Sequence, residues 1–217
     1  MLTHCLKESN VEGAEGILTY FKYKPTECHT ILPHDFITRD KLGYTAVVEF
    51  KKDGTKILIF RSDTGTGKTT TVKHHLKETG SRFISIVSRI SLGEEQTEVF
   101  RDHGIECNYH QELQDTIDKH NNECNGCFYN FKHFEEHEGE NIIITIDSLC
   151  KMEGFTDFYG YTIYLDEINS LIEHLITSPT CAKKRAPIFS LLRKIIREAD
   201  LVIGTDADIS DNCLEVL

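Results

Sequence analysis

The chain has 217 residues, 39% apolar composition and a formal net charge of −11, with neither a repeat nor a low-complexity run, which predicts a globular protein with one main core. The acidic balance excludes adhesion to nucleic acid through bulk charge, so any nucleic acid must be held by local contacts. No stretch approaches the roughly 20 apolar residues that span a bilayer, and the first residues lack the order of a secretion signal, so we expect an intracellular protein with no membrane partner.

Predicted strands follow one another along the chain. Residues 1–43 are poorly readable, whereas residues 44–50 and 57–60 flank Asp53-Gly54, a pair that favours a hairpin turn. Several short, almost continuous apolar runs are typical of strands buried on both faces, as in a parallel sheet. They lie at residues 57–60, 83–87, 142–146, 161–165 and 201–204.

Helical patterns lie between these strands. Ser91-Leu92-Gly93-Glu94 has the form of a capping box and predicts the start of a helix after the strand at 83–87. Apolar residues at helical spacing predict amphipathic helices over 168–176 and 188–199. The alternation predicts an α/β fold with a mainly parallel sheet and helices on both faces, in which ligands bind beyond the carboxyl ends of the strands.

The stretch RSDTGTGKTT, residues 61–70, follows the first of these apolar strands and opens a helical segment, where backbone N–H groups and the helix dipole favour an anion. Glycines let the backbone curl around phosphate oxygens, the lysine can reach the β and γ phosphates, and the next hydroxyl can bind Mg²⁺. The strict pattern has glycine at the place of Ser62, and a flexible turn is the alternative. The favoured interpretation is an ATP site formed by Ser62, Asp63, Thr64, Gly65, Thr66, Gly67, Lys68, Thr69 and Thr70.

A pair of acids, Asp166-Glu167, follows the strand at 161–165 directly. This position places two carboxylates at the carboxyl end of a buried strand, where Mg²⁺ and a γ-phosphate would lie. Asp166 would hold the metal together with Thr69, and Glu167 would orient and deprotonate the attacking water. A helix start is the alternative, because the helix dipole stabilises acids in a first turn.

These motifs occur in a series that resembles a known family. The phosphate loop, with a small residue in place of its first glycine, looks like that of superfamily 2 helicases. It is followed in order by residues 87–92, 146–149, 165–171 and 203–209. The series, which covers about residues 56–217, resembles the herpesvirus-type replication-origin-binding proteins of large DNA viruses and mobile elements.

The resemblance implies a RecA-like motor domain, over residues 44–217, that couples ATP hydrolysis to movement along DNA in replication. By position, Ser88, Arg89 and Ser148 match segments that contact the bound strand, and phosphate contacts of this kind need only Arg, hydroxyl and N–H groups. Asp206 and Asp208 occupy the segment that links hydrolysis to the DNA path; a helix-capping acid is the alternative for Asp206. The nucleus or a viral replication site is a compartment compatible with this role.

A helicase motor closes ATP between two RecA-like lobes, and the second lobe supplies an arginine finger. The printed chain ends shortly after Asp206, so we expect one lobe whose partners are DNA, as a single strand or an origin duplex, and a second lobe or other replication proteins. Without the second lobe, the chain is expected to bind nucleotide but to hydrolyse it poorly and not to unwind a duplex. A nucleotide-binding interaction module without turnover and another P-loop phosphotransferase are the alternative functions.

A Cys/His-rich insertion around residues 107–140 is the remaining constellation. The eight cysteines of an intracellular chain are expected as free thiols or metal ligands. Cys124, Cys127, His133 and His137 offer four ligands suited to Zn²⁺. The alternative is a polar solvated loop, with turns at Asn121-Asn122 and Asn125-Gly126.

Overall fold

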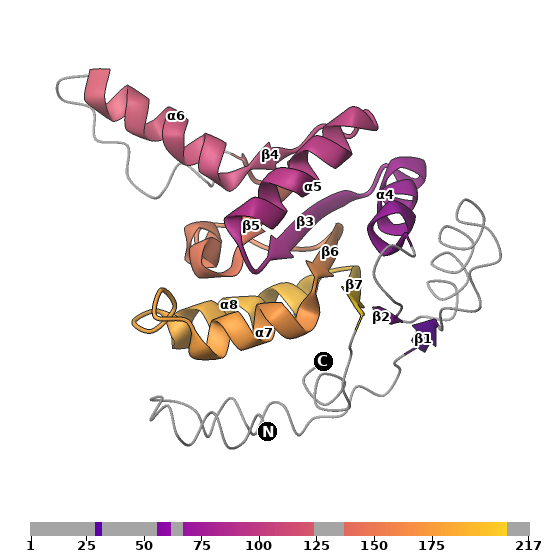
Figure 1. Cartoon of the computed structure of the whole chain (residues 1–217). Helices are drawn as coiled ribbons and strands as arrows, with labels where there is room; N and C mark the ends of the chain where they lie inside the picture. The colour runs from indigo at the N-terminus through magenta and orange to yellow at the C-terminus, as the bar shows by residue number, and fades with distance from the viewer. Residues whose placement is uncertain (1–28, 32–55, 62–66, 124–136, 208–217) are drawn as a thin grey trace.

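The computed structural model describes residues 29–31, 56–61, 67–123 and 137–207, and the structural statements below refer to these ranges. They form a seven-stranded sheet in the order β1-β2-β7-β6-β3-β5-β4, and every pairing in it is parallel (Figure 1). The carboxyl ends of all seven strands therefore meet at one edge of the sheet. The strands are β1 (His29–Ile31), β2 (Ile57–Arg61), β3 (Arg82–Val87), β4 (Asn108–Tyr109), β5 (Ile142–Thr145), β6 (Tyr161–Asp166) and β7 (Leu201–Asp206).

The predicted apolar runs form the central strands because their side chains are buried on both faces of the sheet. In β5, Ile142 and Ile144 join the hydrophobic cluster on one face, while Ile143 joins the cluster on the other. All three side chains are fully buried. A continuous apolar run, rather than an alternating one, is what such a two-sided strand requires.

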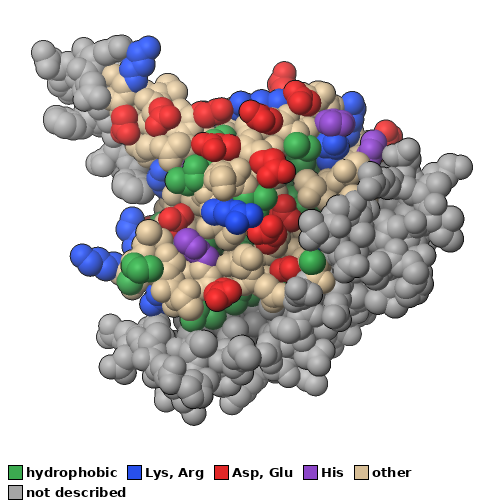
Figure 2. All heavy atoms as spheres, in the orientation of Figure 1, with side chains coloured by type: hydrophobic (Ala, Val, Ile, Leu, Met, Phe, Trp, Pro, Cys, Tyr) green, Lys and Arg blue, Asp and Glu red, His purple; other side chains and the backbone are tan. Residues whose placement is uncertain are grey.

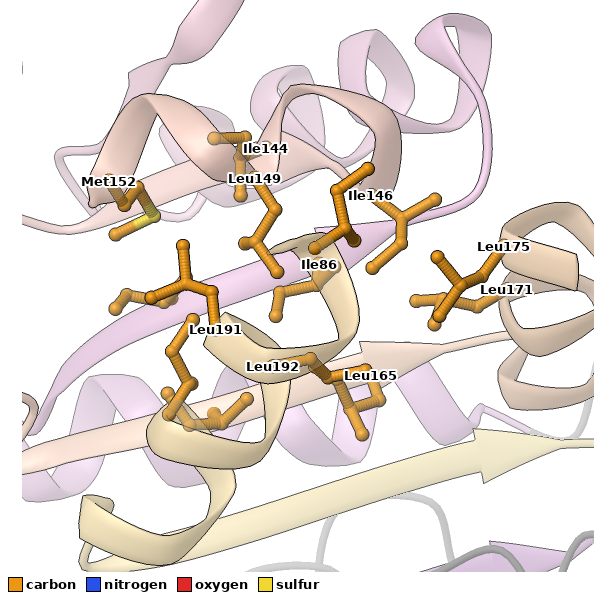
Figure 3. Packing of buried hydrophobic residues seen from close by; sticks show 14 of the residues in the cluster. Ile86, Ile144, Ile146, Leu149, Met152, Leu165, Leu171, Leu175, Leu191 and Leu192 are labelled. Carbon is orange, nitrogen blue, oxygen red and sulfur yellow. The ribbon is translucent and has the colours of Figure 1, made fainter. Parts of the chain in front are cut away.

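Helices cover both faces of the sheet. The helices α4 (Lys68–Thr79) and α5 (Ile90–Asp102) pack on one face, and α7 (Ile168–Thr177), α8 (Arg185–Glu198) and the 3-10 helix η3 (Ile146–Met152) pack on the other. Figure 3 shows the second layer from close by, where Leu171 and Leu175 of α7 and Leu191 and Leu192 of α8 lie against side chains of the sheet. The predicted α/β fold, with a parallel sheet and helices on both faces, is thus confirmed.

The prediction of a hairpin around Asp53-Gly54 is wrong, because the segment expected to be its second strand has other partners. Residues 57–61 pair with β1 on one side and with β7 on the other, both in parallel. Both edges of β2 are thereby occupied, so an antiparallel partner has no place beside it. Residues 44–50, the proposed first strand of the hairpin, lie outside the described residues.

The prediction of a capping box at Ser91 is also wrong, although the predicted helix is present. Helix α5 begins at Ile90, one residue before Ser91, and its N-cap is Arg89 in an extended conformation. The Arg89 carbonyl accepts the first helical hydrogen bond from Gly93 N at 3.2 Å. No side chain, and so no serine hydroxyl, makes a cap hydrogen bond at the start of this helix.

The polar stretch after residue 107 is more ordered than a solvated loop. Asn108–Tyr109 forms the edge strand β4, and His110–Glu123 forms helix α6, which extends beyond the sheet in Figure 1. Asn121-Asn122 lies inside α6 and makes no turn. Ile146, expected at the end of a strand, instead begins η3. The boundary at residue 43 and the insertion limits stay predictions, although β1 shows that the segment before residue 43 supplies a strand.

Among the described helices, none combines the length and the apolar character that crossing a membrane would need.

Candidate functional site

The end of the predicted phosphate loop lies between β2 and α4. Gly67 is the N-cap of α4 and has φ 92°, a left-handed conformation that glycine adopts without strain. With no side-chain cap at this terminus, the first-turn N–H groups have the arrangement that binds phosphate in other proteins. Lys68, Thr69 and Thr70 form the first turn and are each half-buried. Five predicted nucleotide-binding residues lie outside the described ranges: Ser62, Asp63, Thr64, Gly65 and Thr66.

Asp166 ends β6 and is buried, with hydrogen-bond donors on both of its carboxylate oxygens. Thr205 Oγ1 donates to Oδ1 at 2.6 Å, and Gln96 Nε2 donates to Oδ2 at 2.6 Å. The backbone N–H of Glu167 adds a third donor to Oδ1 at 3.1 Å. Buried carboxylates need such partners, and these donors fix the plane of this one.

A fully buried tyrosine joins Asp166 to the first turn of α4. Tyr164 is two residues before Asp166 in β6, so both side chains point to the same face of the sheet. Its hydroxyl lies 3.2 Å from Thr205 Oγ1 and 3.4 Å from Thr69 Oγ1. Burial raises the pKa of Tyr164 well above its ordinary value, and the nearby Asp166 charge adds to this, so the hydroxyl keeps its proton.

Thr69 and Asp166, the two predicted magnesium ligands, are thus brought into one hydrogen-bonded cluster. A hydroxyl and a carboxylate are hard oxygen donors, which Mg²⁺ prefers, and Mg²⁺ usually keeps several water ligands that can fill the remaining positions. The residues present therefore fit a magnesium ion beside the first turn of α4.

Glu167 has a backbone conformation that residues other than glycine rarely adopt. Its φ of 49° and ψ of 60° lie in the left-handed region, at a cost of order 1–3 kcal/mol. Glu167 is the N-cap of α7 but makes no side-chain cap hydrogen bond. Instead Asp206, from the neighbouring strand β7, accepts a hydrogen bond from Asn169 N at 2.8 Å. Asp206 therefore does cap a helix, and the Glu167 side chain is left to other contacts.

The side chain of Arg89 forms an ion pair with the side chain of Glu167. Its Nη2 lies 3.6 Å from Glu167 Oε2, and both side chains are substantially exposed, at 62% and 40%. The neighbouring Ser88 is buried, and Ser148 is half-buried in η3. Of the three predicted DNA contacts, only Arg89 is thus widely accessible. Figure 2 shows Asp and Glu side chains gathered over the face that carries α5.

The predicted zinc ligands are almost all outside the described residues: Cys124, Cys127 and His133 are, and so is the coupling residue Asp208. His137, the remaining member of the set, contacts Glu140 through Nδ1 at 2.8 Å. Within the described ranges, no three His, Cys, Asp or Glu side chains gather as a metal site. Cys107, Cys150 and Cys181 are free thiols.

Three site residues were not singled out from the sequence: Gln96, Tyr164 and Thr205. A usable signal existed for the first two. Gln96 is a polar residue at the helical spacing of Leu92 and Phe100, which marks it as facing the core, and Tyr164 shares the strand face of Asp166. The contact with Thr205 depends on which strand lies beside β6, which the sequence does not state.

The comparisons with known proteins agree with this geometry. The family model described as type III restriction enzyme, res subunit, matches residues 38–174, a range that includes Lys68 and Asp166. No curated protein matches the chain. Domains of the matched family are superfamily 2 helicase-like, ATP-binding lobes with a RecA-like fold, so the coarser part of the predicted resemblance is confirmed. Since the match covers more than half of the chain, the protein belongs to the type III restriction enzyme res subunit family.

Proposed function

We propose that the chain is the ATP-binding motor lobe of a DNA helicase of the origin-binding kind, which couples ATP hydrolysis to DNA contacts in replication. The observation that carries the ATPase part is the cluster in which the Tyr164 hydroxyl lies within 3.4 Å of Thr69 Oγ1 and 3.2 Å of Thr205 Oγ1, while Thr205 donates to Asp166. The replication and origin-binding part is supported by the sequence series from the phosphate loop to Asp208.

The residues of the site would have separate roles in binding and hydrolysing the nucleotide. Mg²⁺ and ATP, when bound, supply a polarised γ-phosphate. Backbone N–H groups of residues 62–70 would hold the phosphates, and Lys68 would neutralise charge on the β and γ groups. Thr69 and Asp166 would hold the metal. Glu167 would orient a water and accept its proton as the water oxygen bonds to the γ-phosphorus and the bond to the β-phosphate oxygen breaks, with ADP as the leaving group.

The contact between Arg89 and Glu167 supports a link between DNA and hydrolysis. An exposed ion pair contributes only ~0.2–1 kcal/mol, so a DNA phosphate can compete for the guanidinium. Removal of Arg89 from Glu167 would leave the carboxylate available to the attacking water. We assign the contacts with the bound DNA strand to Ser88, Arg89 and Ser148. We assign the coupling between ATP hydrolysis and the DNA path to Asp206 and Asp208. A second RecA-like lobe or other replication proteins would complete the motor.

The test is ATP turnover with and without single-stranded DNA, together with nucleotide binding. Lys68→Ala should weaken ATP binding at least tenfold, which is about 1.4 kcal/mol. Lys119→Ala, which changes an exposed lysine on α6, is the matched control and should bind ATP as the wild type does. Glu167→Gln should keep ATP binding and lose hydrolysis in a protein that carries the second lobe. Unchanged affinity in Lys68→Ala contradicts the site.

A nucleotide-binding module without turnover is a second candidate, favoured by the charge around Arg89. Glu94, Glu95 and Glu98 are exposed on α5 and repel phosphates. If Mg²⁺ and ATP bind but no nucleic acid raises turnover, even with a second lobe present, this candidate stands in place of the motor.

A further inference from the structure

We propose that Gln96 is a positioning residue for Asp166, and that its side-chain amide fixes the carboxylate in the orientation needed to hold Mg²⁺. The inference rests on the proposed ATPase function and adds to it a residue outside the predicted motifs. Gln96 lies on α5, which is not one of the elements that carry the phosphate loop or the acid pair.

Gln96 is held on both sides by buried polar groups. The hydroxyl of Ser85, a fully buried residue of β3, donates to Gln96 Oε1 at 2.6 Å, and Gln96 Nε2 donates to Asp166 Oδ2 at 2.6 Å. Gln96 itself is 2% exposed. The ionised Asp166 carboxylate can only accept, so the amide nitrogen of Gln96 must face it, and the Ser85 hydroxyl holds the other end of the amide by donating to Oε1.

A glutamine suits this place because it donates without adding a charge. A lysine or arginine would neutralise Asp166 and weaken its attraction for a metal ion, whereas a neutral amide holds the carboxylate and leaves its charge. Donors of this kind behind a metal ligand typically matter 10–100-fold for metal affinity. With Thr205 holding the other oxygen, Gln96 completes the control of the carboxylate plane.

The same helix carries Arg89 at its start. Arg89 is the N-cap of α5, and Gln96 lies two helical turns further on, about 10 Å along the axis. A displacement of α5 by a ligand at Arg89 would therefore move the donor that sets Asp166. Gln96 thus connects the proposed strand-contacting end of α5 to the metal-binding carboxylate.

The experiment measures binding of a fluorescent ATP analogue to the whole chain during a Mg²⁺ titration and again in EDTA. Gln96→Met keeps an unbranched side chain of similar size and removes the donor. We expect a 10–100-fold weaker apparent affinity for Mg²⁺, with the metal-free affinity for the analogue unchanged. Thr97→Val is the matched control: Thr97 is also buried, but its hydroxyl donates only to Gly93 O in the same helix, so this variant should keep the wild-type Mg²⁺ dependence.

Ser85→Ala provides a second test, which remains decisive if Gln96→Met does not fold. It keeps Gln96 but removes the hydrogen bond that anchors Oε1, so the amide is held less firmly against Asp166 and Mg²⁺ affinity should fall several-fold. Wild-type Mg²⁺ dependence in Gln96→Met, or in Ser85→Ala where only that variant folds, overturns the inference while the proposed ATP site stands. An equal loss in Thr97→Val also overturns it, because the effect then follows packing of α5. Failure of the wild-type chain to bind the analogue with Mg²⁺ instead overturns the proposed function itself.

Discussion

Replacement of Thr205 by valine removes one hydroxyl from the centre of the buried cluster while it keeps the shape of the side chain. Thr205 is fully buried at the carboxyl end of β7. Its hydroxyl donates to Asp166 Oδ1 at 2.6 Å and lies 3.2 Å from the Tyr164 hydroxyl. The valine variant therefore leaves one carboxylate oxygen and one phenol hydroxyl with a missing partner.

The expected loss follows from these two contacts. A hydrogen bond to a charged group contributes ~1.5–3 kcal/mol and a neutral one ~1 kcal/mol. Asp166 Oδ1 retains the Glu167 N–H at 3.1 Å, and Tyr164 retains Thr69 at 3.4 Å, so the full sum is an upper bound. We expect Thr205→Val to lower the free energy of unfolding by ~2–3 kcal/mol. For a domain of this size each kcal/mol shifts Tm by about 2–4 °C, which gives a decrease of roughly 4–12 °C.

Urea and thermal unfolding followed by circular dichroism measure this loss, with Thr205→Ser as the control. Serine keeps the hydroxyl and loses one methyl group, for which ~1 kcal/mol is expected. The reasoning requires Thr205→Val to be less stable than Thr205→Ser, even though valine fills the site better. If the valine variant is the more stable of the two, the hydroxyl contributes less than the ~1 kcal/mol of the methyl group, and the expected loss of ~2–3 kcal/mol is refuted.

Three further predictions concern other parts of the fold. Burial, helped by the charge of Lys151, lowers the pKa of His110 to about 4. The stability that the neutral His110 side chain contributes is therefore present above its unfolded pKa of about 6.5 and is lost as the pH falls towards 4. Urea unfolding across this pH range should show a loss of up to about 3 kcal/mol in the free energy of unfolding, and His110→Asn should lack this loss. Gly93→Ala should lower Tm, because its Cβ would lie 2.7 Å from Cε2 of the buried Tyr109 ring, and ~1–3 kcal/mol of overpacking outweighs the ~1 kcal/mol that alanine gains in a helix. Arg89→Ala should leave ATP binding without DNA unchanged and reduce stimulation of turnover by single-stranded DNA, with Arg89→Lys intermediate; equal stimulation in both variants and the wild type would remove Arg89 from the DNA path.

The central strands and the position of the acid pair could be predicted because both depend on local pattern. An apolar run such as Ile142 to Ile144 specifies a strand buried on both faces, and a parallel sheet places all carboxyl ends at one edge. Asp166 and Lys68 therefore had to lie at the same edge once the strands were recognised. No knowledge of strand order was needed for that conclusion.

Contacts that depend on strand order, or on weak local patterns, could not be predicted in the same way. β1 consists of His29, Thr30 and Ile31, which carry no distinguishing pattern, yet it occupies the edge of β2 that the hairpin was expected to take. Helix α6 is polar along most of its length, so its sequence resembles a loop. For β1 the deciding factor is its pairing with β2, which is distant in sequence.

The acid pair illustrates how a distant neighbour decides the role of a local motif. Asp166-Glu167 by itself fits the start of a helix, and α7 does begin there. A helix start needs a cap, and a Glu167 side chain engaged in capping would have less freedom to orient a water. Asp206 removes this conflict, because it reaches across from β7 to bond Asn169 N. The neighbouring strand thus supplies both the cap that α7 needs and, through Thr205, a donor to Asp166, so Glu167 is not needed as a cap.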